Sequence, residues 1–111
     1  MKLYTAQYKY AGEDQLDITV KGKDPIGPFF ASTWKMVMGS KERKISRDGY
    51  KQMYRELMQK SYRENLGVWN DILGRDEVTL VCFCAFETDC HRYLLAGYLE
   101  KLGAEYMGER V

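Results

Sequence analysis

Large apolar side chains recur every three or four residues between positions 46 and 64, the clearest hydrophobic pattern in the sequence. This spacing places them on one face of a helix, and Ser46 is a suitable N-cap, so we predict a helix from Ser46 to about Glu64. The residues on that face are Tyr50, Met53, Tyr54, Leu57 and Met58. Shorter helices are expected around residues 66–73, ending at Gly74 as a left-handed cap, and around residues 29–37, with Phe30, Trp34 and Val37 inward.

A nearly continuous apolar run at residues 78–85 predicts a strand covered on both faces, typical of the centre of a parallel sheet. Residues 2–10, 16–20 and 104–107 predict three further strands, and a helix from about Cys90 to Leu102 is expected to end at Gly103. Strand, helix and strand in this order form a right-handed crossover. We therefore predict a small three-layer α/β domain, with a mainly parallel sheet flanked by helices.

The composition agrees with a folded chain, because 45% hydrophobic and 14% aromatic residues exclude a disordered one. A length of 111 residues without repeats suggests a single α/β domain, residues 1–111. No segment approaches about eighteen apolar residues, and the start has no apolar signal region. We therefore expect a cytoplasmic protein that does not bind membranes.

The net charge of +1 gives no general attraction to nucleic acid, but one helix has a local excess of basic residues. Lys44, Arg47, Lys51 and Arg55 are spaced so that they form a basic ridge on the helix predicted from Ser46. This ridge is either a contact surface for nucleic acid or protein, or an ordinary solvated helix face.

All three cysteines and the one histidine lie within ten residues, at Cys82, Cys84, Cys90 and His91. They are a possible metal-ligand set, although neighbouring helical residues diverge by about 100°, which is poor geometry for Cys90 and His91 to share an ion. A disulfide between Cys84 and Cys90 is geometrically possible but unusual in the cytoplasm. Cys82 and Cys84 are otherwise expected to pack in the core, and we predict no cofactor.

The helix predicted from Cys90 begins where the central strand has ended, so its free amides and positive dipole end favour an anion beside Cys90. Arg92 adds a full positive charge. We expect Cys90, His91 and Arg92 to form an exposed turn that carries the chemistry of the protein.

An apolar strand ending in cysteine, a short polar loop, and Cys-His-Arg followed by Leu-Leu-Ala together span Leu80 to Ala96. This arrangement resembles the hallmark of domain of unknown function 488, a family of bacterial and phage proteins. Tyr4, Thr5 and Tyr8 look like its opening strand, and Ile18 to Pro25 like its second strand and loop. Members often carry glutamate two residues after the strand cysteine, where this chain has Cys84. The resemblance implies an α/β fold and a site at Cys90-His91-Arg92, without an established reaction.

The leading hypothesis is that the protein binds a small anionic molecule, a nucleotide or a phosphorylated metabolite, in a crevice between the loop from Thr19 and the helix start. Arg92, Thr19, Lys21, Gly22 and Lys23 would bind the ligand. If chemistry occurs, His91 would transfer protons and Cys90 would act as nucleophile. The alternatives are nucleic-acid or protein binding through the basic ridge, and a Cys/His metal site. Whether the protein is an enzyme stays open.

Overall fold

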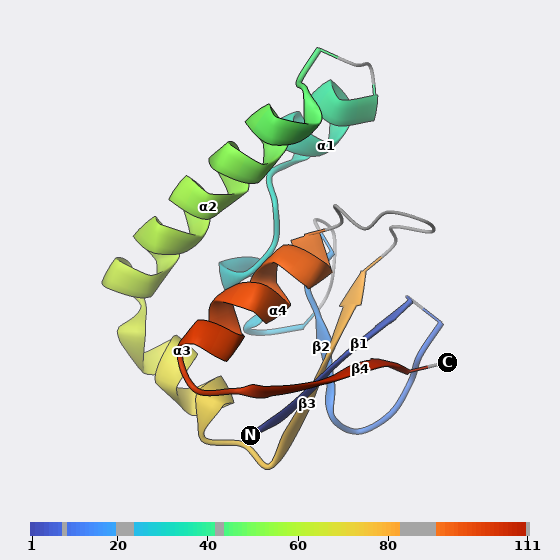
Figure 1. Ribbon diagram of the computed structural model, residues 1–111, viewed down its shortest axis with the longest axis vertical. Coiled ribbons are helices and arrows are strands. Elements are labelled where there is room, and N and C mark those ends of the chain that lie inside the picture. The colour runs from blue at the N-terminus through green and yellow to red at the C-terminus, as the bar shows by residue number, and fades with distance from the viewer. Residues whose placement is uncertain (8, 20–23, 42–43, 83–90, 111) are drawn as a thin grey trace.

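Four strands form one parallel sheet in the computed structural model, which describes residues 1–7, 9–19, 24–41, 44–82 and 91–110 (Figure 1). The strands are β1 (Lys2–Gln7), β2 (Gln15–Asp17), β3 (Glu77–Cys82) and β4 (Glu105–Arg110), in the order β2-β3-β1-β4. The apolar run therefore forms an inner strand as far as Cys82, and residues 83–85 lie outside the described part. The prediction of an α/β fold with a mainly parallel sheet is confirmed.

The long helix α2 (Arg47–Glu64) begins and ends where its hydrophobic pattern predicts. The Ser46 hydroxyl caps it by accepting a hydrogen bond from the Gly49 amide at 3.0 Å. Tyr54 and Met58, from the predicted apolar face, are buried in the core. Local spacing and capping are therefore sufficient to define this element.

Two glycines that were both predicted to end helices do so in different ways. Gly103 follows α4 (His91–Lys101) with a φ of 108°, in the left-handed region. Gly74 follows α3 (Leu66–Leu73) with a φ of −84°, so the prediction of a left-handed cap is wrong there. The Gly74 amide still donates to the carbonyls of Asn70 and Asp71, which keeps it in right-handed helical geometry.

The segment at residues 29–37 does not form the single helix that was predicted. A short 3-10 turn, η1 (Gly27–Phe29), is followed by residues without regular structure, and α1 (Trp34–Lys41) begins only afterwards. Side chains of α2 account for this break, since Tyr54 donates to the Phe30 carbonyl and Ser61 to the Phe29 carbonyl, each at 2.7 Å. Phe30 is buried as expected, whereas the side chains of Trp34 and Val37 lie outside the described part.

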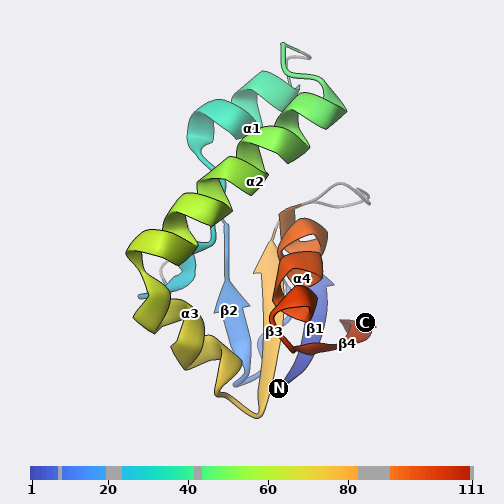
Figure 2. The ribbon, with the colours of Figure 1, turned by 60° about the vertical axis from the view of Figure 1, so that its left-hand side comes forward.

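The described helices cover one face of the sheet, as Figures 1 and 2 show. Leu95 and Leu99 of α4 share a core with Leu3 of β1 and with Val78 and Leu80 of β3, and α2 packs beside α4. Sequence reasoning predicted helices on both faces. In the described residues this face carries all of them, which makes two layers rather than three.

The opposite face is covered by the segment that connects β1 to β2 and by a side chain of β4. Arg110 lies over the Tyr4 ring, 3.6 Å from its centroid, and donates to Thr79 Oγ1 at 3.0 Å. Asp14 accepts hydrogen bonds from Thr79, at 2.5 Å, and from Tyr10, at 2.6 Å. Residues 9–14 therefore cross the side of the sheet that α4 leaves uncovered.

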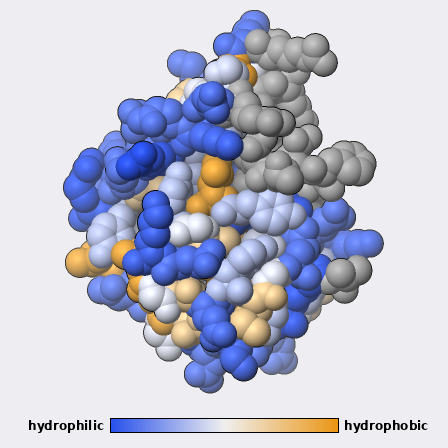
Figure 3. Space-filling model, viewed as in Figure 1, coloured by the Kyte–Doolittle hydropathy of each residue, from blue (hydrophilic) through white to orange (hydrophobic). Residues whose placement is uncertain are grey.

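The surface seen from the α4 side is mostly hydrophilic, with hydrophobic residues showing between charged ones (Figure 3). Among the helices of the described residues, none combines the length and the apolar character that a membrane span requires.

Candidate functional site

The carboxyl ends of β1 and β3 lie side by side, with Gln7 paired to Cys82. The chain leaves these two strands toward opposite faces of the sheet. After β1 it reaches the face covered by Tyr10 and Asp14, and after β3 it reaches α4 on the other face. In open α/β sheets, ligands bind in the crevice outside such a pair of strands, because neither connection covers it. The edge beside Gln7 and Cys82 is therefore the candidate site.

A hydrogen bond joins the chain after β2 to the start of α4 at this edge. His91, the first residue of α4, donates from Nε2 to the carbonyl oxygen of Ile18 at 2.7 Å. The His91 ring also lies edge-on to the ring of Tyr54, with centroids 5.6 Å apart. Both sides of the predicted crevice are therefore held together, and the histidine that holds them is only 4% exposed.

Thr19 follows Ile18 and folds back onto the end of β2. Its amide and its hydroxyl both donate to Asp17 Oδ1, at 3.0 and 2.6 Å. This small turn starts the segment in which Lys21, Gly22 and Lys23 were predicted to bind a ligand. Those three residues lie outside the described part.

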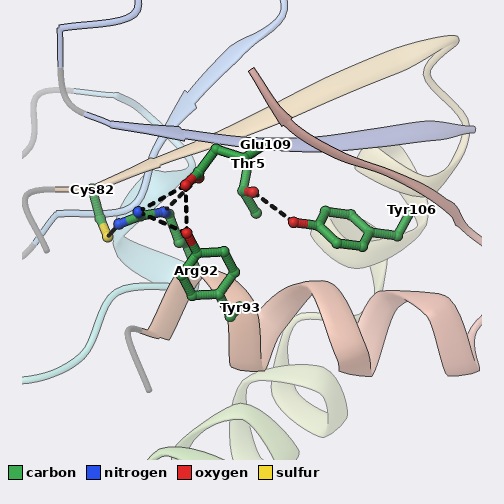
Figure 4. A network of polar contacts seen from close by, with 6 residues as sticks. All are labelled: Thr5, Cys82, Arg92, Tyr93, Tyr106 and Glu109. Carbon is green, nitrogen blue, oxygen red and sulfur yellow. Dashed lines mark hydrogen bonds and ion pairs between the residues drawn. The ribbon is translucent and has the colours of Figure 1, made fainter. Parts of the chain in front are cut away.

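Arg92 is buried and is the centre of a polar network that reaches the surface at Glu109, shown in Figure 4. Its guanidinium forms a two-pronged ion pair with Glu109 of β4, with Nε 3.0 Å from Oε1 and Nη2 3.3 Å from Oε2. Nη1 donates to the Cys82 sulfur at 3.3 Å, and Nη2 donates to the Tyr93 hydroxyl at 3.0 Å. Tyr93 in turn donates to Glu109. One cation thus ties the end of β3 to β4 and to the first turn of α4.

The charges of this network are mutually stabilised despite their burial. Burial disfavours the charged form of Glu109, but hydrogen bonds from Arg92, Tyr93 and Thr5 outweigh it and keep the pKa of Glu109 below its usual value. Burial also disfavours the Arg92 cation, but hydrogen bonds to Glu109 and Cys82 raise the pKa of Arg92 above its usual value. Arg92 and Glu109 are therefore both charged at neutral pH.

In contrast to Arg92 and Glu109, His91 is held in its uncharged form. Burial lowers the pKa of His91, the Ile18 carbonyl partly opposes this shift, and the Arg92 charge adds to it. The imidazole is therefore neutral at neutral pH and carries its proton on Nε2. In this state it positions the backbone after β2.

An irregularity in β4 brings Glu109 to the network. The pairing of β1 with β4 shifts by one residue between Leu3, opposite Tyr106, and Tyr4, opposite Gly108. Gly108 has a φ of 110°, a backbone conformation that favours glycine. Without such a bulge, residues three apart point to opposite faces of a strand. With the bulge, the Tyr106 hydroxyl lies 2.7 Å from the Thr5 hydroxyl, and the Glu109 side chain also contacts Thr5.

Sequence reasoning missed Thr5, Tyr93, Tyr106 and Glu109. Tyr93 is next to Arg92 in the sequence, but Glu109 reaches Arg92 only through the bulge and the pairing of β4 with β1. The one local signal was the glycine at position 108, which is typical of a strand irregularity.

The predicted site residues divide into two groups. The structure brings Thr19, His91 and Arg92 to the same edge of the sheet, whereas Cys90, Lys21, Gly22 and Lys23 lie outside the described residues. The prediction of an exposed turn is wrong for two of its members, since His91 is 4% and Arg92 1% exposed. Both are buried because they hold other elements, Ile18 in one case and Glu109 in the other.

The expected core position of Cys82 is confirmed, because its side chain is fully buried in the apolar cluster. Cys84 lies outside the described residues. Within the part of the chain that is described, no three His, Cys, Asp or Glu side chains gather as metal ligands. The proposed four-ligand set is not tested by this, since Cys84 and Cys90 belong to it.

The basic ridge predicted on α2 is only partly described. Lys44 and Arg55 are exposed and Lys51 is half-buried, while the Arg47 side chain lies outside the described part. Arg55 lies beside Tyr98 at a surface groove.

Comparison with known families gives one clear assignment. The profile of DUF488-N3a, described as the active DUF488-N3 subclade, matches residues 6–103. The match runs from the end of β1 to beyond α4 and includes Cys82, His91 and Arg92 at the edge of the sheet. Comparison with curated proteins and with solved structures found no match. The resemblance to domain of unknown function 488 is thus confirmed, and the chain belongs to the DUF488-N3a family.

Proposed function

We propose that the protein binds a small anionic molecule, a nucleotide or a phosphorylated metabolite, at the carboxyl edge of its sheet. The observation that carries this proposal is the divergence of the chain toward opposite faces after β1 and β3, because open α/β sheets bind their ligands outside such a pair of strands. The start of α4 lies at the same edge, so its amide groups and dipole favour a negative charge there.

The buried residues of this edge are assigned to positioning. His91 holds the backbone at Ile18, and Arg92 holds the end of β3 against β4. Contacts with the ligand are assigned to Cys90 and to Thr19, Lys21, Gly22 and Lys23, whose positions in the chain flank these anchored points. Cys90 is the candidate nucleophile.

The test is a thermal-shift titration of the intact protein with inorganic phosphate and with a panel of nucleoside mono-, di- and triphosphates. We expect at least one nucleotide to raise the melting temperature, and the rise should continue with the logarithm of its concentration once the site is saturated. The Lys21→Ala/Lys23→Ala double variant should lose this shift. The Lys60→Ala/Arg63→Ala double variant, with the same change in charge on an exposed part of α2, should keep it.

Two results would reject the proposal. One is a shift that survives in Lys21→Ala/Lys23→Ala, and the other is the absence of any shift across the panel. If single-stranded or duplex oligonucleotides bind instead, and the Lys44→Ala/Lys51→Ala variant abolishes this binding, the basic ridge of α2 is the functional surface.

A further inference from the structure

A surface groove lies at the opposite end of α4 from the candidate site. Its volume is about 260 Å³, and it is formed by α2, α3, α4 and the residue after α4. The lining side chains combine aromatic, aliphatic and cationic groups: Arg55, Met58, Gln59, Tyr62, Trp69, Tyr98, Lys101 and Leu102. His91 and Lys101 are separated by ten residues of helix, about 15 Å at 1.5 Å per residue, so the groove is distinct from the sheet edge.

The two cations of the groove have no acidic partner among the described residues. The described ion pairs and hydrogen bonds of the protein do not include Arg55 or Lys101. Arg55 instead lies near Tyr98, where its charge opposes the rise that burial produces in the pKa of the Tyr98 hydroxyl. Two cations are therefore available at the rim for an anionic group.

The floor and margins of the groove are apolar. Trp69 is fixed at the base by a hydrogen bond from Nε1 to Ser61 Oγ at 3.0 Å and by edge-on packing of Tyr62. Leu102 is 40% exposed and Tyr62 36%. Figure 3 shows hydrophobic surface among charged side chains in the region where α2 and α4 approach α3. This preformed surface offers apolar contact next to positive charge.

The shape favours a segment of another protein over a free small molecule. Small-molecule sites usually enclose about 300–1,000 Å³ and cover most of the ligand. This groove has a volume of about 260 Å³, and its margins stay open, so it accommodates one or two side chains of a larger partner.

We infer that this groove docks an acidic peptide segment of a partner protein, with a large aliphatic side chain against Tyr62 and Leu102 and a neighbouring carboxylate at Arg55 and Lys101. A peptide in which acidic and aliphatic residues alternate presents a carboxylate and an aliphatic side chain next to each other. The inference does not depend on the proposed function, because the two sites share no residue.

The test is a fluorescence-anisotropy titration of the whole protein with a fluorescein-labelled hexapeptide in which glutamate alternates with leucine. We expect saturable binding that weakens as salt is raised. A matched peptide with glutamine in place of glutamate should bind about fivefold more weakly, as expected for the loss of two exposed ion pairs. The Arg55→Ala/Lys101→Ala variant should weaken binding of the glutamate peptide by a similar factor.

Matched variants separate the groove from general surface effects. Lys60→Ala/Arg63→Ala removes the same charge from α2 outside the groove and should bind like the unmodified protein. Leu102→Gln should weaken binding about fivefold by removing apolar contact, and circular dichroism should show that it is folded. Equal binding of the two peptides, or equal loss in Lys60→Ala/Arg63→Ala, would overturn the inference. So would self-association of the protein that Leu102→Gln abolishes, because the groove would then hold a second copy.

Discussion

The guanidinium of Arg92 is 1% exposed, whereas the side chain of its partner Glu109 is 32% exposed. Removing Arg92 and removing Glu109 therefore have different consequences for the charge that remains. Without Arg92, the Glu109 carboxylate can regain water at the surface. Without Glu109, the Arg92 cation stays in the interior with its main anionic partner lost, which is the more costly situation.

We predict that Glu109→Ala destabilises the protein by about 3 kcal/mol. The Arg92→Leu/Glu109→Ala double variant should be more stable than Glu109→Ala alone, because the buried cation that has lost its ion pair with Glu109 is gone. Glu105→Ala, an exposed carboxylate on the same strand, should cost less than about 0.5 kcal/mol. Urea denaturation measures all three, and a double variant less stable than Glu109→Ala would contradict this account of the network.

The single histidine makes the pH dependence of stability simple to interpret. The pKa of His91 is lower in the folded protein than in the unfolded chain, so the unfolded chain binds more protons between these two values. The free energy of unfolding should therefore fall as the pH drops below about 6.5, by no more than about 1.4 kcal/mol per pH unit. The carboxylates of Asp14 and Glu109, whose pKa values are also lowered, titrate at lower pH.

His91→Gln is the matched variant, since glutamine keeps a donor for the Ile18 carbonyl but does not titrate. We expect its stability to change less than that of the unmodified protein between pH 7.5 and 5.5, as measured by urea denaturation in a series of buffers. Parallel curves for the two proteins would show that His91 is not the titrating group.

At the scale of elements, two glycines with free space around them have opposite roles. A methyl group added at Gly108 or at Gly97 would meet no atom within 4 Å, so neither substitution causes a clash. Gly108 has a φ of 110° in the bulge of β4, whereas Gly97 lies within α4. Backbone preference alone therefore decides the effect.

We predict that Gly108→Ala destabilises the protein by about 1–2 kcal/mol, and that Gly97→Ala stabilises it by up to about 1 kcal/mol. Differential scanning calorimetry would measure the shift of the melting temperature for each. The same sign for both substitutions would be inconsistent with the bulge as the reason for Gly108.

The elements also show how far the sequence predicts the structure. The bounds of α2 follow from its own spacing and from Ser46, which are local properties. The break after Phe30 depends on hydroxyl groups of α2 that lie 24 and 32 residues further along the chain. The ion pair of Arg92 with Glu109 depends on which strand is the neighbour of β1 and on a bulge in it. The hydrophobic periodicity of a sequence indicates which residues are buried, but it does not identify the residues that they contact.

At the scale of the whole molecule, one apolar cluster includes residues of β1, β2, β3 and of α1, α2, α3 and α4. We therefore predict that residues 1–111 unfold cooperatively as one domain. Tryptophan fluorescence and far-ultraviolet circular dichroism should give coincident denaturation curves with the same midpoint. Separate transitions would show that α1 and α2 form a unit apart from the sheet.

The position of β1 between β3 and β4 has a consequence for how the protein is made. Lys2 of β1 pairs with Glu77 of β3 on one side and with Glu105 of β4 on the other. The pairing of β1 therefore cannot be completed until both of these later strands have been synthesised. Pairings this distant in the chain slow folding, because a long loop must close before either contact forms. The nascent chain therefore exposes one edge of β1 until residues 77–82 have left the ribosome and the other edge until residues 105–110 have followed, so the sheet is completed only at that point.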